Sequence, residues 1–201
     1  MALITPFNFP LEIPALQLLS SLYMGNKPVV KSDTKVAVVL EQFLRLLHAC
    51  GLPEIDADMI NCTGPVMEDL LMQSHPRMTL FTGSSRVAGH LATALQGRCK
   101  VEDAGFDWKI LGPDVDSRDN MMEYVAWVCD QDAYACSGQK CSAQSMLFMH
   151  QNWVQQGFVD RLKSLAAQRN LEDLSVGPVL TVSNQSPASR VRFTAHNPPL
   201  I

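Results

Sequence analysis

The 201 residues of this chain suffice to bury one sizeable core or to carry parts of two domains. Hydrophobic residues make up 47% and charged residues 18%, which is typical of a soluble globular protein. The formal net charge of −4 comes without a long run of either sign, which argues against a nucleic-acid or anionic-membrane partner. The apolar runs are far too short to span a bilayer.

The first 22 residues are apolar, but they lack a basic segment and are interrupted by Pro6, Pro10 and Pro14, so they do not match a signal or transit peptide. The six cysteines form no C-x-x-C pair and are scattered through apolar segments, as in proteins of a reducing compartment. The five histidines show no metal-ligand spacing. The sequence therefore predicts no metal site.

Helix-like and strand-like segments alternate along the first half of the chain. A helix over 14–24 is predicted to begin with Pro14 and to stop at Gly25. A second helix, capped by Asp33 or Thr34, is expected to end at Gly51. The other predicted elements are strands at 28–31, 58–62 and 78–82 and helices at 64–73 and 84–95. This β-α-β-α order predicts a parallel sheet with helices on both faces.

The second half continues the α/β pattern as far as residue 182. Two short strands are expected between 99 and 111, then a helix over 123–135, a strand over 145–150 and a helix over 153–169. Residues 183–201 show neither helical nor strand periodicity. We expect them to form an irregular tail with no fold of its own.

Cys141 is the candidate nucleophile. Its neighbours in 137–143 are small and polar, and Gly138 allows the backbone to approach a substrate closely. A reactive thiolate there needs stabilisation by backbone N–H groups or by a cation such as Lys140. Taken alone, Cys141 is either a nucleophile or a structural cysteine. We expect it to be the most reactive of the six thiols.

Two more residues could take part in acyl-transfer chemistry. Glu102 ends an apolar strand and is followed by small residues, so it is expected beside a crevice, partly buried, where a general base belongs. A solvated strand-end carboxylate is the other interpretation. Asn8 lies between two aromatic residues and two prolines. Its amide either donates to an oxyanion or stabilises a turn.

A phosphate site is predicted where Gly83 and Ser84 separate a strand from a helix. The free N–H groups and the dipole of a helix N-terminus attract anions. Ser84 is equally suited to be an ordinary N-cap, and the G-x-G-x-x-G fingerprint of common dinucleotide-binding domains is absent. Lys31, at the end of a short strand, could reach a ribose or a phosphate, or could simply be exposed.

The order of these segments resembles the successive signatures of the NAD(P)-dependent aldehyde dehydrogenase superfamily. The resemblance covers about residues 3–182, and 78–180 are most similar to the plant-type Δ1-pyrroline-5-carboxylate dehydrogenase branch. It rests on residues 6–10, 81–84, 101–102, 138–141 and 177–179. It implies an incomplete aldehyde dehydrogenase fold: part of a Rossmann-like NAD-binding domain over 1–102, the start of an α/β catalytic domain over 103–182, and a tail over 183–201 outside the family pattern.

The resemblance also implies roles for individual residues. Cys141 matches the family's nucleophile, Glu102 its general base, and Asn8 an oxyanion donor together with the Cys141 backbone N–H. Ser142, which follows the nucleophile, matches a substrate-binding position. The positions matching NAD-binding residues are Thr5, Phe7, Lys31, Phe81, Gly83, Ser84 and Val87. The implied reaction is the oxidation of glutamate γ-semialdehyde to glutamate in mitochondrial proline breakdown, through a Cys141 thioester, in an enzyme whose full-length relatives are homo-oligomers.

Some features depart from the family pattern. Asp103 and Ala104 stand where two glycines are usual, and no clear ribose-binding carboxylate follows Lys31. The resemblance implies a fragment of a longer subunit, for which we expect turnover far below that of a full-length relative. Two other hypotheses stay open: a non-catalytic remnant or interaction protein that keeps the site residues by descent, and a cysteine hydrolase or thioesterase, which needs a histidine partner.

Overall fold

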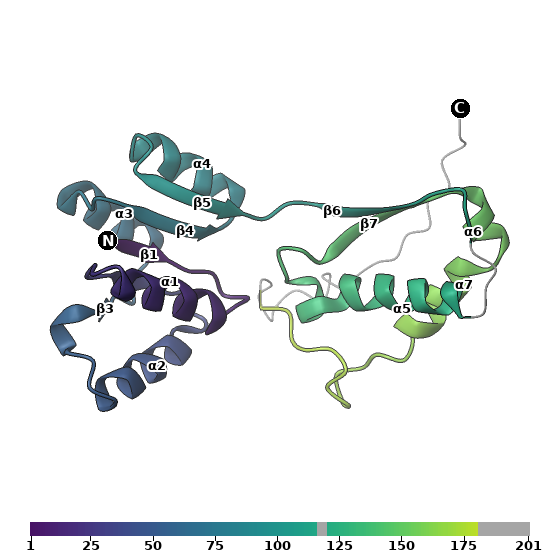
Figure 1. Cartoon of the computed structure of the whole chain (residues 1–201), viewed down its shortest axis with the longest axis horizontal. Coiled ribbons are helices and arrows are strands. Elements are labelled where there is room, and N and C mark those ends of the chain that lie inside the picture. The colour runs from purple at the N-terminus through teal and green to yellow at the C-terminus, as the bar shows by residue number, and fades with distance from the viewer. Residues whose placement is uncertain (116–119, 181–201) are drawn as a thin grey trace.

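The computed structural model describes residues 1–115 and 120–180, which form two lobes joined by an extended connection (Figure 1). In the first lobe, five parallel strands form one sheet in the order β3-β2-β1-β4-β5. In the second lobe, β6 pairs in parallel with β7. The strands are β1 (Ala2–Ile4), β2 (Val29–Lys31), β3 (Asp58–Met59), β4 (Thr79–Gly83), β5 (Cys99–Asp103), β6 (Asp107–Leu111) and β7 (Gln144–Met149).

Helices cover both faces of the first sheet, as the alternation of elements predicts. The helices are α1 (Glu12–Tyr23), α2 (Ala37–Ala49), α3 (Gly64–Ser74) and α4 (Ser85–Ala94), with a 3-10 turn at Glu54–Asp56. Successive residues of a strand point to opposite faces. Leu3 therefore packs with Leu18 of α1 and Leu40 of α2, whereas Ala2 packs with Met67 of α3 and Leu91 of α4.

The central strand β1 is absent from the sequence prediction. Residues 2–4 are too few to show a strand period, yet they pair with β2 on one side and β4 on the other, and Leu3 is completely buried. Two other expectations are wrong in detail. The strand predicted over 58–62 is only two residues long. Helix α2 begins at Ala37, and the Asp33 carboxylate instead accepts a hydrogen bond from the Lys35 N–H.

Three helices pack against the two-stranded sheet of the second lobe. They are α5 (Met121–Tyr134), α6 (Gln151–Gln155) and α7 (Phe158–Ala166), and a 3-10 turn spans Ala135–Gly138. Ala126, Cys129, Trp153 and Phe158 form the core. The single helix predicted over 153–169 is wrong, because Gly157 adopts a left-handed backbone with φ of 78° and divides it into α6 and α7.

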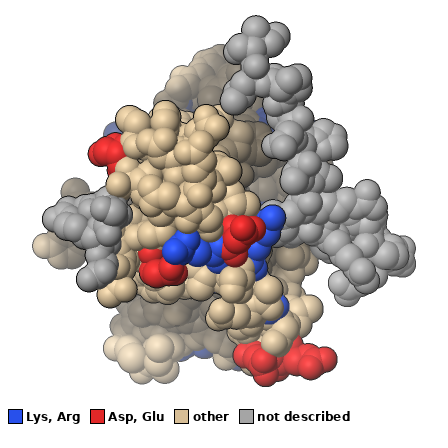
Figure 2. Space-filling view, turned by 90° about the vertical axis from the view of Figure 1, so that its right-hand side faces the viewer, with Lys and Arg blue, Asp and Glu red and all other residues tan. Residues whose placement is uncertain are grey.

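Charges of both signs are interleaved at the end of the second lobe (Figure 2). On α7, Arg161 pairs with Glu123, and Lys163 pairs with Asp160. Within residues 1–115 and 120–180, no helix combines the length and the apolar character that crossing a membrane requires. The irregular tail predicted over 183–201 lies outside the described residues.

Candidate active site

A cleft of about 1030 Å³ lies at the carboxyl ends of the first lobe's strands and extends to the second lobe. The chain leaves β1 towards β2 on one side and leaves β4 towards β5 on the other, so the adjacent strands β1 and β4 form a topological switch point. Ligands of open α/β sheets bind at such points. The predicted site residues that line the cleft are Thr5, Phe7, Asn8, Lys31, Phe81, Gly83, Ser84, Val87, Glu102 and Cys141.

Ser142 is the one predicted site residue that is not among those lining the cleft. It is exposed and lies in a turn closed by a hydrogen bond from the Ala143 N–H to the Lys140 carbonyl. Within that turn Ala143, rather than Ser142, is buried. The structure therefore brings Cys141 to the cleft without its neighbour.

The loop that carries Cys141 has an unusual backbone. After α5, Cys136, Ser137 and Gly138 have φ values of 50°, 57° and 76°, and the first two lack the freedom of glycine. Contacts from outside the loop hold this conformation: the Ser137 hydroxyl donates to the Gly177 carbonyl at 3.0 Å and accepts from the Gly177 N–H at 2.8 Å. Cys141 follows this turn, is exposed and faces the cleft.

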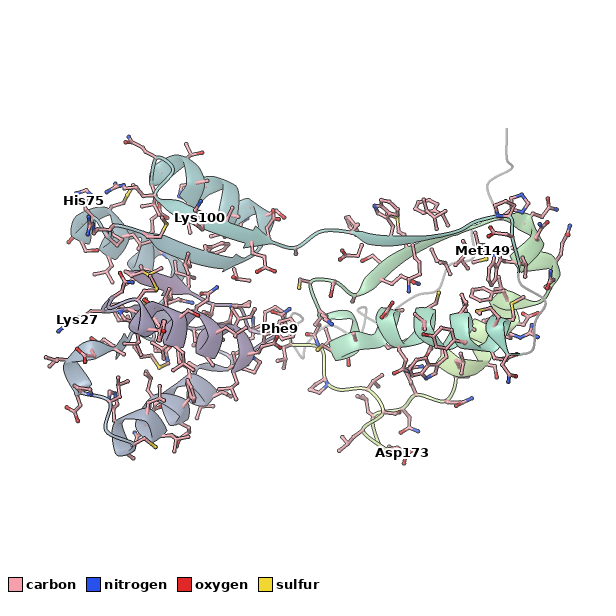
Figure 3. The ribbon with its side chains drawn as sticks, in the orientation of Figure 1. Phe9, Lys27, His75, Lys100, Met149 and Asp173 are labelled. Atoms are coloured by element: carbon pink, nitrogen blue, oxygen red, sulfur yellow. The ribbon has the colours of Figure 1, made fainter. Side chains whose placement is uncertain are left out.

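Asn8 joins the N-terminal segment to this loop. Its Nδ2 donates a hydrogen bond of 2.6 Å to the carbonyl oxygen of Gln139, 131 positions along the chain. The neighbouring Phe9 lies at the edge of the first lobe that faces the second (Figure 3). The Asn8 amide is thus bonded to the residue that lies two positions before Cys141. This places it in the loop region where an oxyanion donor to a Cys141 adduct is needed.

Glu102 lines the cleft but is exposed, so the predicted partial burial is wrong. It lies on β5, opposite Thr82 of β4 in the parallel ladder. Among the described strands β5 is an edge, paired only with β4. Its neighbour Val101 is 46% exposed for the same reason. The carboxylate is therefore open to water, as in the solvated strand-end interpretation, although it lines the same cleft as Cys141.

The other half of the cleft has the features of an anion site. Ser84 is the N-cap of α4, and in the part of the chain that the structure describes its side chain makes no capping hydrogen bond to the first-turn N–H groups of the helix. Gly83, the last residue of β4, has little free space: an added Cβ would lie 2.7 Å from the Phe81 ring. The buried Thr5 hydroxyl lines the cleft and has no hydrogen-bond partner among the described residues, so a polar group of a ligand could bond to it.

Sequence reasoning missed several residues of the cleft. His90 of α4 received no role, yet it lines the cleft and its Nε2 lies 2.6 Å from the Glu68 carboxylate of α3. Arg86 of α4 was also missed, and it adds positive charge to a lining that includes Lys31 and Lys140. Gln139 was also missed, although its position in the loop before Cys141 was a signal. Among the described residues, no group of three or more His, Cys, Asp and Glu side chains could hold a metal ion.

Comparison with known proteins connects this cleft with a family. The family model of the aldehyde dehydrogenase family matches residues 1–192. A protein of Linum usitatissimum named "Probable aldehyde dehydrogenase" is 66% identical over 92% of the chain. Delta-1-pyrroline-5-carboxylate dehydrogenase 12A1, mitochondrial, of Arabidopsis thaliana is 62% identical over 92% of the chain. The chain spans 33% of the length of each of these two relatives.

Solved structures share the fold. Methylmalonate-semialdehyde dehydrogenase of Oceanimonas doudoroffii superposes with a TM-score of 0.76 at 22% identity, over 84% of this chain and 34% of that one. Proline utilization A of Bradyrhizobium japonicum gives a TM-score of 0.75 at 25% identity, over 82% of this chain and 17% of that one. The parallel sheet, the cleft at its carboxyl edge and the family match agree: the chain belongs to the aldehyde dehydrogenase family, with close similarity to a plant pyrroline-5-carboxylate dehydrogenase.

Proposed function

We propose that this chain carries the nucleophile, the general base and the oxyanion donor of an NAD-dependent aldehyde oxidation. The observation that supports it most is the meeting of Cys141, Asn8 and Glu102 in one cleft, although they lie far apart in the sequence. The substrate we propose is glutamate γ-semialdehyde, the open form of 1-pyrroline-5-carboxylate, with glutamate as product. The similarity to the Arabidopsis enzyme supports this choice.

The residues of the first lobe fit a dinucleotide. The N-terminus of α4 and the glycine before it would hold the pyrophosphate, because N–H groups and the helix dipole favour an anion there. Lys31 would reach the adenosine ribose, with Val87 beside the adenine and Phe81 near the cofactor. Thr5 and Phe7 would form the wall beside the nicotinamide. When bound, NAD accepts the hydride that the aldehyde carbon loses.

The chain's own residues carry the remaining chemistry. The Cys141 thiolate attacks the aldehyde carbon, and the charge that develops on the oxygen is stabilised by the Asn8 amide and the Cys141 backbone N–H. Loss of the hydride from this adduct turns it into an acyl group, which stays on Cys141 as a thioester. Glu102 then removes a proton from a water molecule as this water attacks the thioester, which releases the carboxylate product and restores the thiolate.

The setting proposed for the chain follows its relatives. We place it in the mitochondrion, as the name of the Arabidopsis relative states for that protein, and in a homo-oligomer. The domain division proposed from the sequence, 1–102 and 103–182, is supported by the two separate sheets. Ser142 is proposed to contact the substrate, in a position that the described cleft does not include.

Three variants of the 201-residue chain test the assignment. NADH formation with glutamate γ-semialdehyde is expected to be slow and to disappear in Cys141→Ala. The control Cys50→Ala, which removes another exposed thiol outside the cleft, should leave it unchanged. Glu102→Gln should release up to one equivalent of NADH and then stall, because the thioester forms but is not hydrolysed. NADH formation that survives Cys141→Ala would contradict the proposal.

NAD binding separates this proposal from its alternative. Calorimetry on the wild-type chain should detect NAD binding. Ser84→Asp should weaken this binding, because it places a negative charge at the α4 N-terminus. Ser164→Asp, at an exposed position of α7, is the matched control. A chain that neither binds NAD nor forms NADH through Cys141 would instead favour the non-catalytic remnant.

A further inference from the structure

The Gln139 side chain uses its whole amide to hold two stretches of main chain together. Its Nε2 donates to the Cys136 carbonyl at 3.1 Å and to the Pro178 carbonyl at 3.0 Å. Its Oε1 accepts from the Leu180 N–H at 2.7 Å. The side chain thus closes the turn that precedes Cys141 and attaches it to residues 178–180.

The main chain of the same residue holds the other half of the site. The Gln139 carbonyl accepts the 2.6 Å hydrogen bond from Asn8 Nδ2. An asparagine amide has two N–H bonds. One of them is directed at Gln139, which restrains the Asn8 amide. No hydrogen bond to a described residue uses the second N–H, so it is left for an oxygen in the cleft that Asn8 lines.

We propose that Gln139 is a positioning residue that sets the Cys141 thiol and the Asn8 amide in one geometry. The inference rests on the proposed function, because it assigns Asn8 and Cys141 to the same reaction centre. Gln139 does not touch the reacting atoms. It acts through the loop, whose left-handed residues Cys136 and Ser137 would relax without contacts from outside.

The chemistry of the network explains why the residue is glutamine. Its amide both donates and accepts, as two carbonyls and one N–H require. In Gln139→Glu the carboxylate still accepts from Leu180, but it faces the Cys136 and Pro178 carbonyls as a charged acceptor. In Gln139→Ala the Pro178 carbonyl and the Leu180 N–H lose this partner, whereas the Cys136 carbonyl keeps its hydrogen bond from the residue 139 backbone N–H. Both variants should therefore let the loop move away from Asn8.

A double-mutant cycle between Asn8 and Gln139 tests the proposal. In the 201-residue chain, the alkylation rate of Cys141 by iodoacetamide is followed by mass spectrometry, with Cys50 of the same molecule as the reference. Rates are compared at the alkaline plateau, so that a change in thiol ionisation does not enter. Iodoacetamide suits the test because its carbonyl oxygen can accept the second N–H of Asn8.

The expected result is strong coupling. Asn8→Ala and Gln139→Ala should each slow the labelling of Cys141 relative to Cys50, and the double variant should be no slower than the slower single one. Gln139→Glu should resemble Gln139→Ala. The control Gln155→Glu, at an exposed position of α6, should label at the wild-type rate. Variants whose melting temperature falls are compared below their transitions.

Turnover provides the second readout. Misplacement of about 1 Å can cost on the order of a hundredfold in rate. Gln139→Ala should accordingly lower kcat by up to that factor while the KM for NAD stays within about twofold. Additive effects in the cycle, or labelling unchanged in both Gln139 variants, would overturn the proposal. If the wild-type chain forms no NADH, the proposed function fails, while the labelling cycle still decides the role of Gln139.

Discussion

The two sheets of this molecule are covered to different degrees. The five-stranded sheet lies between α1 and α2 on one face and α3 and α4 on the other, and Leu3 at its centre is 0% exposed. The two-stranded sheet packs the partly buried Leu147 and Leu111 against the helical core. On its strands, Trp108 and Ile110 are 62% and 64% exposed.

This difference means that the two lobes depend on different interactions. Burial of apolar area stabilises the first lobe. The second lobe has a smaller core, so single polar contacts account for more of its stability. The site combines residues of both lobes: the first lobe supplies Asn8, and the loop with Cys141 comes from the second.

The stability of the two lobes can be followed with different signals. All three tryptophans lie between residues 108 and 153, so tryptophan fluorescence reports the second lobe, whereas circular dichroism reports both.

The largest expected effect is in the second lobe, at the ion pair between Asp130 and Arg169. The side chains are only 3% and 13% exposed, and the guanidinium also lies 4.3 Å from the centre of the Tyr134 ring. Asp130→Ala should lower the free energy of unfolding by about 3–5 kcal/mol, because it leaves a buried charge without its partner. The measurement is urea denaturation followed by tryptophan fluorescence.

Asp160 provides the matched control for that experiment. Its pair with Lys163 is fully on the surface, with a separation of 3.7 Å. Asp160→Ala should change the free energy of unfolding by less than about 0.5 kcal/mol. Equal losses in the two variants would show that the second lobe does not depend on its buried ion pair.

A pair of strand substitutions compares the two sheets directly. Leu3→Ala should cost about 2–5 kcal/mol, since it creates a cavity between β1 and the helices α1 and α2. Ile110→Ala, on the exposed side of β6, should stay within about 0.5 kcal/mol. Circular dichroism measures the first variant and tryptophan fluorescence the second. A cost at Ile110 as large as at Leu3 would mean that this face of β6 is covered in solution.

The smallest expected effects come from two glycines and have opposite signs. Gly157, with φ of 78°, divides α6 from α7, so Gly157→Ala should destabilise the second lobe by roughly 1–2 kcal/mol. Gly89 lies inside α4, where an added Cβ would meet no atom of the described residues within 4 Å. Gly89→Ala should stabilise the first lobe by up to about 1 kcal/mol through helix propensity. Melting curves of the two variants that shift in the same direction would contradict this assignment.

Much of the fold could be predicted from local sequence. The helices at 64–74 and 85–94 and the strands at 29–31 and 79–83 agree with the predicted segments within a few residues, because apolar spacing and stop residues act over short distances. The strand Ala2–Ile4 could not be found in this way. Its conformation comes from pairing with β2 and β4, and these strands meet β1 only when the chain folds.

The features of the site likewise separate into those that local sequence predicts and those that depend on tertiary structure. The residues themselves could be proposed from the chain: a cysteine in a small polar loop, a carboxylate at a strand end and a glycine-serine step before a helix. Three properties depend on the tertiary structure: Glu102 is exposed because β5 is an edge of the described sheet, Asn8 reaches Gln139 across 131 positions, and Ser142 is not among the residues that line the cleft. Local spacing determines which element a residue forms, whereas burial and the meeting of distant side chains depend on how the elements pack.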